Sequence, residues 1–254
     1  MNRMDINNLS FSYESGIEIL KKISFTSNKK ESIGIIGANG AGKSTLLRIL
    51  VGLELGFAGE VLINQIPITK KTLPQIREQI GYLFQNSDHQ LFTQTVFSEV
   101  AFALQNYGMD ETTVEEKVMK SLETINISHL KDKKIYKMSG GEKKMVSIAT
   151  VLAMEPQILI MDEPTIALDP KNRRTLIQTL NRLSYTKIIA SHDLDMILET
   201  CDRVILLSEG RIVSDDFTKK ILYNKELLED NNLELPLSVF GEQKAKSIYE
   251  ENIH

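Results

Sequence analysis

The stretch Gly37-Ala38-Asn39-Gly40-Ala41-Gly42-Lys43-Ser44 decides the fold of this chain. It fits the pattern G-x-x-x-x-G-K-[ST], in which glycines allow backbone N–H groups to turn inward around phosphate oxygens. The pattern requires a strand before it and a helix after it. Both are expected, because the β-branched run 32–36 ends at the first glycine and residues 43–51 place leucines along one helical face. A glycine-rich turn that only caps a helix has no use for the lysine, so the sequence predicts a phosphate-binding loop.

The residue types of this loop have distinct expected tasks. The helix that begins near Lys43 presents unpaired N–H groups and the positive end of its dipole to the anion. Lys43 adds positive charge at the β and γ phosphates, and Ser44 offers its hydroxyl to Mg²⁺. The candidate nucleotide-binding residues are therefore Gly37, Ala38, Asn39, Gly40, Ala41, Gly42, Lys43, Ser44 and Thr45.

Two adjacent acids, Asp162 and Glu163, follow the buried-strand pattern of residues 158–161. Open α/β sheets bind ligands at this carboxyl edge. Successive strand residues point to opposite sides, so the two carboxylates are expected to do different work. Asp162 is the candidate to hold Mg²⁺, directly or through water, and Glu163 the candidate to polarise the attacking water. A pair of solvated acids at a strand end is the plain alternative, which the nearby phosphate-binding loop disfavours.

The periodicity of the remaining chain predicts an α/β fold with a mostly parallel sheet and an N-terminal antiparallel β layer. Residues 6–13 and 19–25 form the expected antiparallel pair, and apolar runs at 60–64, 80–84, 158–161 and 187–190 predict further strands. A helix is expected at 173–183, and a closing hairpin at 203–208 and 211–213.

A helical subdomain is expected to interrupt the sheet. Strand patterns disappear from Val96 to Leu130, where Val114, Val118 and Leu122 recur at helical spacing. We place this inserted subdomain at about 88–152, within a phosphate-binding domain of residues 1–214. Residues 215–254 hold nine acids and five bases, which predicts a short, acidic, mostly helical and peripheral C-terminal extension.

Composition excludes several classes of function. The 254 residues are 42% hydrophobic and 25% charged, which is ordinary for a folded chain. Apolar runs fall far short of the ~20 residues of a membrane-spanning helix, and no secretory pattern opens the chain, so we expect the cytoplasm. The net charge of −4 resides entirely in the extension, and the neutral body contains no Trp. Nucleic acid is therefore not an expected partner.

The segment Ser139-Gly140-Gly141-Glu142 resembles the signature of ATP-binding-cassette (ABC) ATPases. Gln85 matches the glutamine loop of that family, Ala167-Leu168-Asp169 the D-loop, His192 the switch loop, and Tyr13 the aromatic that stacks on adenine. The resemblance covers roughly residues 4–214. Independently of it, Ser139 and Glu142 fit the S-x-x-E pattern of a capping box at a helix start. Met138 and Glu142 depart from the leucine and glutamine that are usual in the signature.

The resemblance implies a P-loop NTPase of the ABC type that binds ATP and Mg²⁺ and hydrolyses ATP. In the family two cassettes face head to tail, so each chain supplies half of each site, and the second subunit is either identical or related. The implied catalytic residues are Glu163, His192, Gln85 and Lys43, and the implied metal ligands are Ser44, Gln85 and Asp162. The resemblance adds Tyr13, Ser139, Gly140, Gly141, Glu142 and Asp169 to the nucleotide-binding residues.

The segment from Gln85 to Phe92 resembles energy-coupling factor importers, which take up vitamins or cobalt and nickel ions. That likeness implies a transmembrane coupling subunit bound in a groove near Gln85, Leu91, Phe92 and Phe97, and an indirect partnership with a membrane substrate-binding subunit. The chain would then lie on the cytoplasmic face of the cell membrane as a peripheral protein. The short extension favours cobalt or nickel over a vitamin.

The residues alone leave three other classes of function open. A soluble ABC ATPase acting on DNA or ribosomes usually carries a long coiled-coil insertion or tandem cassettes, and this chain predicts neither. A P-loop kinase for a small molecule is disfavoured by Glu163, the signature and His192 together. A nucleotide sensor without turnover would bind nucleotide and release no phosphate.

Overall fold

The computed structural model describes residues 3–14 and 16–241 of the 254. The N-terminal part forms a four-stranded antiparallel sheet with the strand order β2-β1-β4-β5. This sheet confirms the expected N-terminal β layer, and each of the two expected strands begins and ends within two residues of its predicted bounds. The strands are β1 (Met4–Ser12), β2 (Glu18–Thr26), β4 (Ala58–Ile63) and β5 (Ile66–Pro67).

The second sheet has six strands in the order β10-β9-β3-β8-β7-β6. Its strands run parallel except for β10, which is antiparallel to β9, so the expected mostly parallel sheet is confirmed. Because β3, β8 and β7 are neighbours, their carboxyl ends bring together segments far apart in sequence. The strands are β3 (Ser32–Ile36), β6 (Ile80–Leu83), β7 (Ile158–Asp162), β8 (Thr186–Ala190), β9 (Arg203–Ser208) and β10 (Arg211–Phe217).

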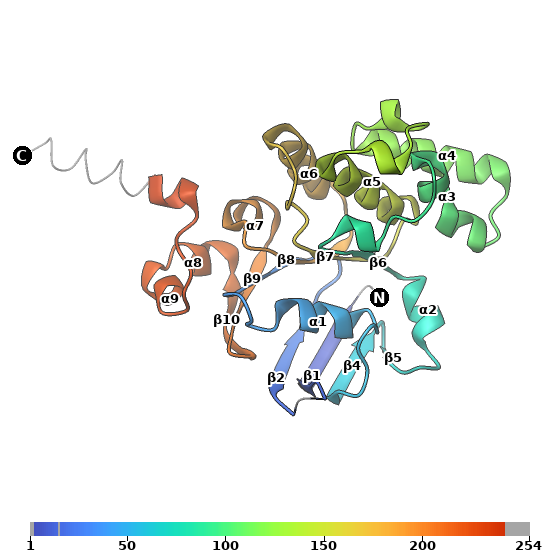
Figure 1. Cartoon of the computed structure of the whole chain (residues 1–254). Coiled ribbons are helices and arrows are strands. Elements are labelled where there is room, and N and C mark those ends of the chain that lie inside the picture. The colour runs from blue at the N-terminus through green and yellow to red at the C-terminus, as the bar shows by residue number, and fades with distance from the viewer. Residues whose placement is uncertain (1–2, 15, 242–254) are drawn as a thin grey trace, which may run out of the picture.

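The helix α1 (Lys43–Leu50) lies between the two sheets, as Figure 1 shows. Its leucines join a core cluster that also contains Ile158 and Ile160 of β7, whereas Leu159 and Met161 belong to a second cluster on the other face of the sheet. Both faces of the parallel sheet are thus buried, which explains the unbroken apolar pattern of its strands. The second face is covered by helices that include α6 (Pro170–Arg182) and α7 (Leu194–Thr200).

Helices fill the chain between β6 and β7, and these described residues contain no strand. Val114, Val118 and Leu122 are buried, as their spacing predicted. The subdomain limits of 88 and 152 stay a prediction, and the last helix runs one residue past them. These elements are η1 (Ser87–His89), α3 (Val96–Asn106), α4 (Glu111–Thr124), η2 (Ser128–Leu130), η3 (Ile135–Lys137) and α5 (Gly140–Ala153), and α2 (Leu73–Arg77) precedes β6.

The C-terminal region differs from the expected peripheral tail. Strand β10 continues to Phe217, four residues past the expected hairpin, because Arg203 of β9 forms an ion pair with Asp215 across the ladder. The helices α8 (Thr218–Leu222) and α9 (Lys225–Glu229) bury Ile221 and Leu228 in the main core. The first part of the predicted extension is therefore attached to the core by these residues, although Leu237 and Phe240 stay exposed, and residues 242–254 lie outside the described residues.

A helix that crosses a bilayer must be both long and apolar. Among the described residues, no helix meets both conditions.

Candidate functional site

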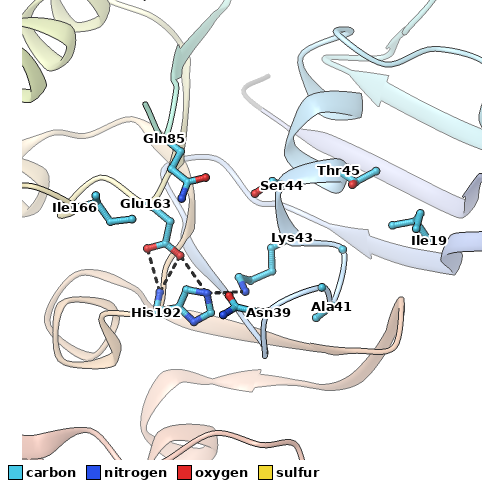
Figure 2. A pocket seen from close by; sticks show the side chains of 12 residues that line it. Ile19, Asn39, Ala41, Lys43, Ser44, Thr45, Gln85, Glu163, Ile166 and His192 are labelled. Atoms are coloured by element: carbon cyan, nitrogen blue, oxygen red, sulfur yellow. Dashed lines mark hydrogen bonds and ion pairs between the residues drawn. The ribbon is translucent and has the colours of Figure 1, made fainter. Parts of the chain in front are cut away.

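A cavity of about 470 Å³ opens at the carboxyl edge of the parallel sheet. Its walls are residues 39–45 of the phosphate-binding loop together with Ile19, Gln85, Glu163, Ile166 and His192. In Figure 2, Gln85, Glu163 and His192 lie on the side of the cavity opposite Ser44 and Thr45. The fold thus gathers residues from four predicted segments around one space.

The backbone of the phosphate-binding loop requires glycine at two places. A Cβ atom at Gly37 would lie 2.2 Å from the carbonyl oxygen of Leu207, which is backbone and cannot swing away. Gly42, the residue before α1, has φ 102°. Any residue with a Cβ atom would be strained in this left-handed conformation, and glycine is not. These glycines let the loop turn sharply between β3 and α1, as the motif predicted.

Lys43 is buried and points back into the loop. Its Nζ donates to the carbonyl oxygens of Gly37, at 2.7 Å, and Ala38, at 3.1 Å, and lies 3.2 Å from Nε2 of His192. Burial lowers the pKa of Lys43 below its usual value, although Glu163 and Asp162 act in the opposite direction. The ammonium group therefore lies among the groups that would surround a phosphate.

Asp162 and Glu163 face different neighbours, as expected, but the reason differs from simple strand alternation. Strand β7 ends at Asp162, and Glu163 takes a left-handed conformation with φ 47° while its N–H donates to the Ala190 carbonyl at 2.9 Å. Asp162 accepts a hydrogen bond from the Ser44 hydroxyl. Burial raises the pKa of Asp162 even though that hydrogen bond and nearby cations oppose the shift.

The carboxylate of Glu163 is held by the segment that follows β8. It accepts from Oγ of Ser191 at 3.1 Å and from the backbone N–H of His192 at 3.1 and 3.2 Å. His192 Nε2 lies 3.6 Å from the same carboxylate. Sequence reasoning missed the role of Ser191. Its position at a strand end, directly before the expected switch histidine, could have indicated that role.

Gln85 lines the cavity one residue after Phe84, and its backbone is fixed by a second missed residue, Lys144. The Nζ atom of Lys144 donates to the carbonyl oxygens of Phe84 (3.0 Å) and Gln85 (2.9 Å). Only 1% of Lys144 is exposed, and burial lowers its pKa to about 8. The sequence offered no clear signal for its burial, because Lys144 follows Lys143 at the partly exposed start of α5.

Tyr13 approaches the site without lining the cavity. Its hydroxyl lies 3.5 Å from Oγ1 of Thr45, and its ring packs edge-on against Phe11 with 4.9 Å between ring centres. The ring is 38% exposed, which leaves it surface for a contact with a base. Its assignment as the adenine-stacking residue stays a prediction.

The signature segment, Ser139 to Glu142, lies at the start of α5, away from the cavity. The capping box is confirmed, because Ser139 Oγ accepts from the Glu142 N–H at 3.2 Å and the Glu142 carboxylate accepts from the Ser139 N–H at 2.9 Å. A Cβ atom at Gly141 would lie 2.9 Å from the carbonyl oxygen of Ala167 in the D-loop. Asp169 caps α6 by accepting from the Asn172 N–H at 2.8 Å. Among the described residues, neither the signature segment nor Asp169 lines the cavity.

The donors expected for Mg²⁺ suit that ion. A hydroxyl, an amide and a carboxylate are oxygen donors, and the Ser44 hydroxyl is already joined to the buried Asp162 carboxylate. Within the described ranges, no three or more His, Cys, Asp or Glu residues gather as a metal cluster.

The apolar residues expected to form a partner groove divide into two groups. Leu91 and Phe97 are partly buried against the core of the helices, whereas Phe92 is 67% exposed and packs edge-on against Phe102 with 4.7 Å between ring centres. A separate hollow of about 160 Å³ is lined mainly by apolar residues that precede Gln85 in the chain. They are Val51, Leu53, Ile76, Arg77, Ile80, Tyr82 and Phe84.

Comparison with known proteins was made on sequence and on structure. The family model described as ABC transporter matches residues 20–166. An ABC transporter ATP-binding protein of Geobacter sulfurreducens is 46% identical over 94% of this chain and 96% of its own length. The energy-coupling factor transporter ATP-binding protein EcfA of Methanoculleus marisnigri is 38% identical over 93% of this chain and 87% of its own length.

Solved structures agree with these relatives. CbiO1 of Clostridium perfringens, part of the ABC transporter complex cbiONQ, superposes with a TM-score of 0.79 and 36% identity over 94% of this chain and 98% of its own. The cassette MJ0796, solved as a dimer with ADP and phosphate, gives a TM-score of 0.79 and 27% identity over 85% of this chain and 98% of its own. Family, relatives and fold coincide with the P-loop, the signature segment and the paired acids described above. The chain therefore belongs to the ATP-hydrolysing cassette subunits of ABC transporters and resembles the energy-coupling factor type.

Proposed function

We propose that this chain is the ATP-binding subunit of an energy-coupling factor importer, in which ATP-driven closure of two cassettes powers uptake of a cobalt or nickel ion or a vitamin. The observation that carries the proposal is the division of the site. The phosphate-binding loop and Glu163 line one cavity, while the signature segment of the same chain does not line it and its Gly140 lines a neighbouring hollow. We infer that a second cassette completes the site, and the similar cassette MJ0796 is a dimer in its structure with ADP and phosphate.

Within the proposed site, the residues act as follows. Lys43 and the backbone N–H groups of residues 37–45 bind the phosphates, and Tyr13 contacts the adenine. Mg²⁺, when bound by Ser44, Asp162 and Gln85, neutralises charge on the phosphate oxygens. Glu163 orients the attacking water and accepts its proton.

His192 has a positioning role beside these groups. Its backbone N–H holds the Glu163 carboxylate, and its ring lies next to Lys43. Here the imidazole can contact both the terminal phosphate and the water. Ser139, Gly140, Gly141 and Glu142, with Asp169, contact the nucleotide held by the second subunit.

The proposed membrane partner is a coupling helix of a transmembrane subunit. Two apolar features are candidates for its contact surface: the exposed Phe92 with Phe102, and the hollow whose lining includes Phe84, the residue before Gln85. An amphipathic helix lays its apolar face into a groove of this kind. The chain is then peripheral on the cytoplasmic side of the membrane.

The test is affinity purification of the tagged chain from detergent-solubilised membranes of its own host, with identification of all co-purifying proteins. We expect a membrane-spanning partner and a small substrate-binding membrane protein whose identity gives the cargo class. Phe92→Ser should lose these partners and still bind ATP, whereas Phe217→Ser, at a 76% exposed position on β10, should keep them. A purely soluble complex, or ribosomes, would contradict the transport role and leave the ATPase.

A further inference from the structure

Glu142 places a negative charge in the signature segment, where glutamine is usual. It is the third residue of α5 and accepts from the Ser139 N–H at 2.9 Å. A glutamine fits the same capping geometry without charge, because either side chain offers an oxygen to that N–H group. The capping box therefore does not explain why this chain carries an acid.

The charge of Glu142 is permanent at neutral pH. Hydrogen bonds from Lys133 and from the Ser139 backbone hold the pKa of Glu142 below its usual value. Under the proposed function, on which this inference rests, the same helix end approaches the terminal phosphate of the ATP on the second subunit. An uncompensated carboxylate at that place would repel the phosphate and weaken closure.

Lys133 supplies the compensation from a fixed backbone position. Its Nζ donates to Oε1 of Glu142 at 2.6 Å. The backbone of Lys133 is held at both polar groups, because its N–H donates to the Leu130 carbonyl at 2.8 Å and its carbonyl accepts from the Val96 N–H at 3.1 Å. The lysine is thus anchored to α3 and η2 and directed at the signature segment.

The ion pair between Lys133 and Glu142 is expected to contribute little to the free energy of unfolding. The side chain of Lys133 is 35% exposed and that of Glu142 is 28% exposed, and pairs of this exposure contribute little to unfolding free energy. Both carboxylate oxygens of Glu142 are engaged, one by Lys133 and one by the Ser139 N–H. The Ser139 Oγ acts as an acceptor in the capping box, so its proton is left for an anion.

We propose that Lys133 is a positioning residue of the ATPase reaction, which neutralises Glu142 so that the signature segment can close on the phosphate bound by the second subunit. The Lys133–Glu142 pair then does as a neutral unit what an uncharged glutamine does alone. Removal of the lysine leaves an acid facing a phosphate. Removal of both charges restores neutrality.

The test is a charge-compensation series on the purified full chain: Lys133→Met, Glu142→Gln, the double variant, and Lys133→Arg. Lys133→Met should raise the ATP concentration for half-maximal hydrolysis about tenfold, the size of a charge coupling of about 1.4 kcal/mol near a protein surface, with a smaller change in kcat. The double variant and Lys133→Arg should return to within about twofold of wild type. Glu142→Gln alone should lie at or below the wild-type concentration.

Two further readouts do not depend on turnover. In a Glu163→Gln background, Lys133→Met should shift the ATP concentration that drives dimerisation upward by a similar factor. Raising the salt concentration should shrink this shift, because it screens the exposed Glu142 carboxylate. Lys117→Met is the control for loss of a lysine, since it removes another Lys–Glu contact of 2.6 Å, to Glu155, which keeps its contact with Lys120, and it should change neither measurement.

A Lys133→Met variant that matches wild type, or a double variant no better than Lys133→Met, would overturn this inference. In either case wild-type hydrolysis and its dimerisation would leave the proposed function intact. A wild-type chain that binds ATP without dimerising, either with itself or with the related cassette of its purified complex, would overturn the proposed function and this inference together. Thermal unfolding of each variant near the wild-type midpoint separates a charge effect from loss of folding.

Discussion

At the residue scale, Glu163 shows how one carboxylate is prepared for proton transfer. Its left-handed backbone, with φ 47°, turns it out of β7 while Ser191 and the His192 N–H hold the carboxylate on the cavity side. The side chain is only 7% exposed, so few water molecules compete for its oxygens. The neighbouring Asp162 is engaged by Ser44 instead, which leaves Glu163 as the carboxylate that faces the cavity.

We expect Glu163→Gln to lower the hydrolysis rate by about 10²- to 10⁴-fold and to leave ATP binding intact, because an amide accepts a hydrogen bond but cannot take the proton of water. ATP-bound dimers should then accumulate. Phosphate release and light scattering with ATP measure the two effects. Glu209→Gln is the matched control, since Glu209 also has φ 47° but lies in the exposed turn between β9 and β10. Normal hydrolysis by Glu163→Gln would assign the proton acceptor to another group.

At the scale of elements, an ion pair joins the D-loop helix α6 to the switch segment. Arg173 donates to both carboxylate oxygens of Asp193, at 2.6 and 2.7 Å, and Asp193 caps α7 by accepting from the Met196 N–H. Burial raises the pKa of Asp193, but the hydrogen bonds from Arg173 and Met196 outweigh burial and leave it below its usual value. Asp193 directly follows His192 in the chain, so the position of His192 depends on the contact between Asp193 and Arg173 of α6.

We expect Arg173→Met to lower kcat several-fold with little change in ATP affinity, because His192 loses its fixed support. The loss of the hydrogen bonds to the charged carboxylate should also destabilise the fold by about 1–2 kcal/mol at neutral pH. In wild type the lowered pKa gives a contribution that is present above the unfolded value of 3.8 and is lost as the pH falls through the folded value. In the variant, burial without the cation raises that pKa, so the difference between the two proteins should shrink on acidification.

Steady-state kinetics and urea denaturation at pH 7 and about pH 4 check this prediction. Arg174→Met is the control, since Arg174 also joins α6 to α7, through Glu199, but lies 53% exposed and one residue further along. A stability difference that grows on acidification would contradict the assigned pKa shift.

The elements that sequence patterns predicted well are those whose neighbours are local. Strand β7 follows from its continuous apolar run, and the start of α5 follows from the spacing of Ser139 and Glu142. The features that were missed depend on contacts distant in sequence. The turn of Glu163 depends on the Ala190 carbonyl, the length of β10 on Arg203, and the burial of Lys144 on the carbonyls after β6. No local pattern distinguishes the buried Lys144 from Lys143, which forms a surface pair with Asp88.

At the scale of the whole molecule, the candidate site occupies two surfaces of the chain, which border each other at Gln85 and Ile166. The cavity contains the phosphate-binding loop, Glu163 and His192, whereas Gly140 lines a different hollow, of about 250 Å³, together with Ala167 of the D-loop. A Cβ atom at Gly141 would press on the Ala167 carbonyl, so the signature and D-loop form one surface. If that surface acts on a second chain, defects in the two faces must complement each other.

We therefore expect Lys43→Ala and Gly141→Asp to be inactive separately and active when mixed. Lys43→Ala should fail to bind ATP, and Gly141→Asp should bind ATP without hydrolysing it. In a mixed dimer, the intact loop of the Gly141→Asp chain meets the intact signature of the Lys43→Ala chain, which rebuilds one of the two sites. Random pairing makes half of the dimers mixed, so the mixture should recover roughly a quarter of wild-type phosphate release.

Mixing each variant with itself at the same total concentration is the control, and thermal unfolding checks that Gly141→Asp folds despite its contact with Ala167. Recovery can arise only if loop and signature come from different copies of this chain, because neither variant contains both. Absence of recovery from folded variants would mean that this chain pairs with a related cassette instead of with itself. Repeating the mixture with such a cassette from the purified complex would then locate the second half of each site.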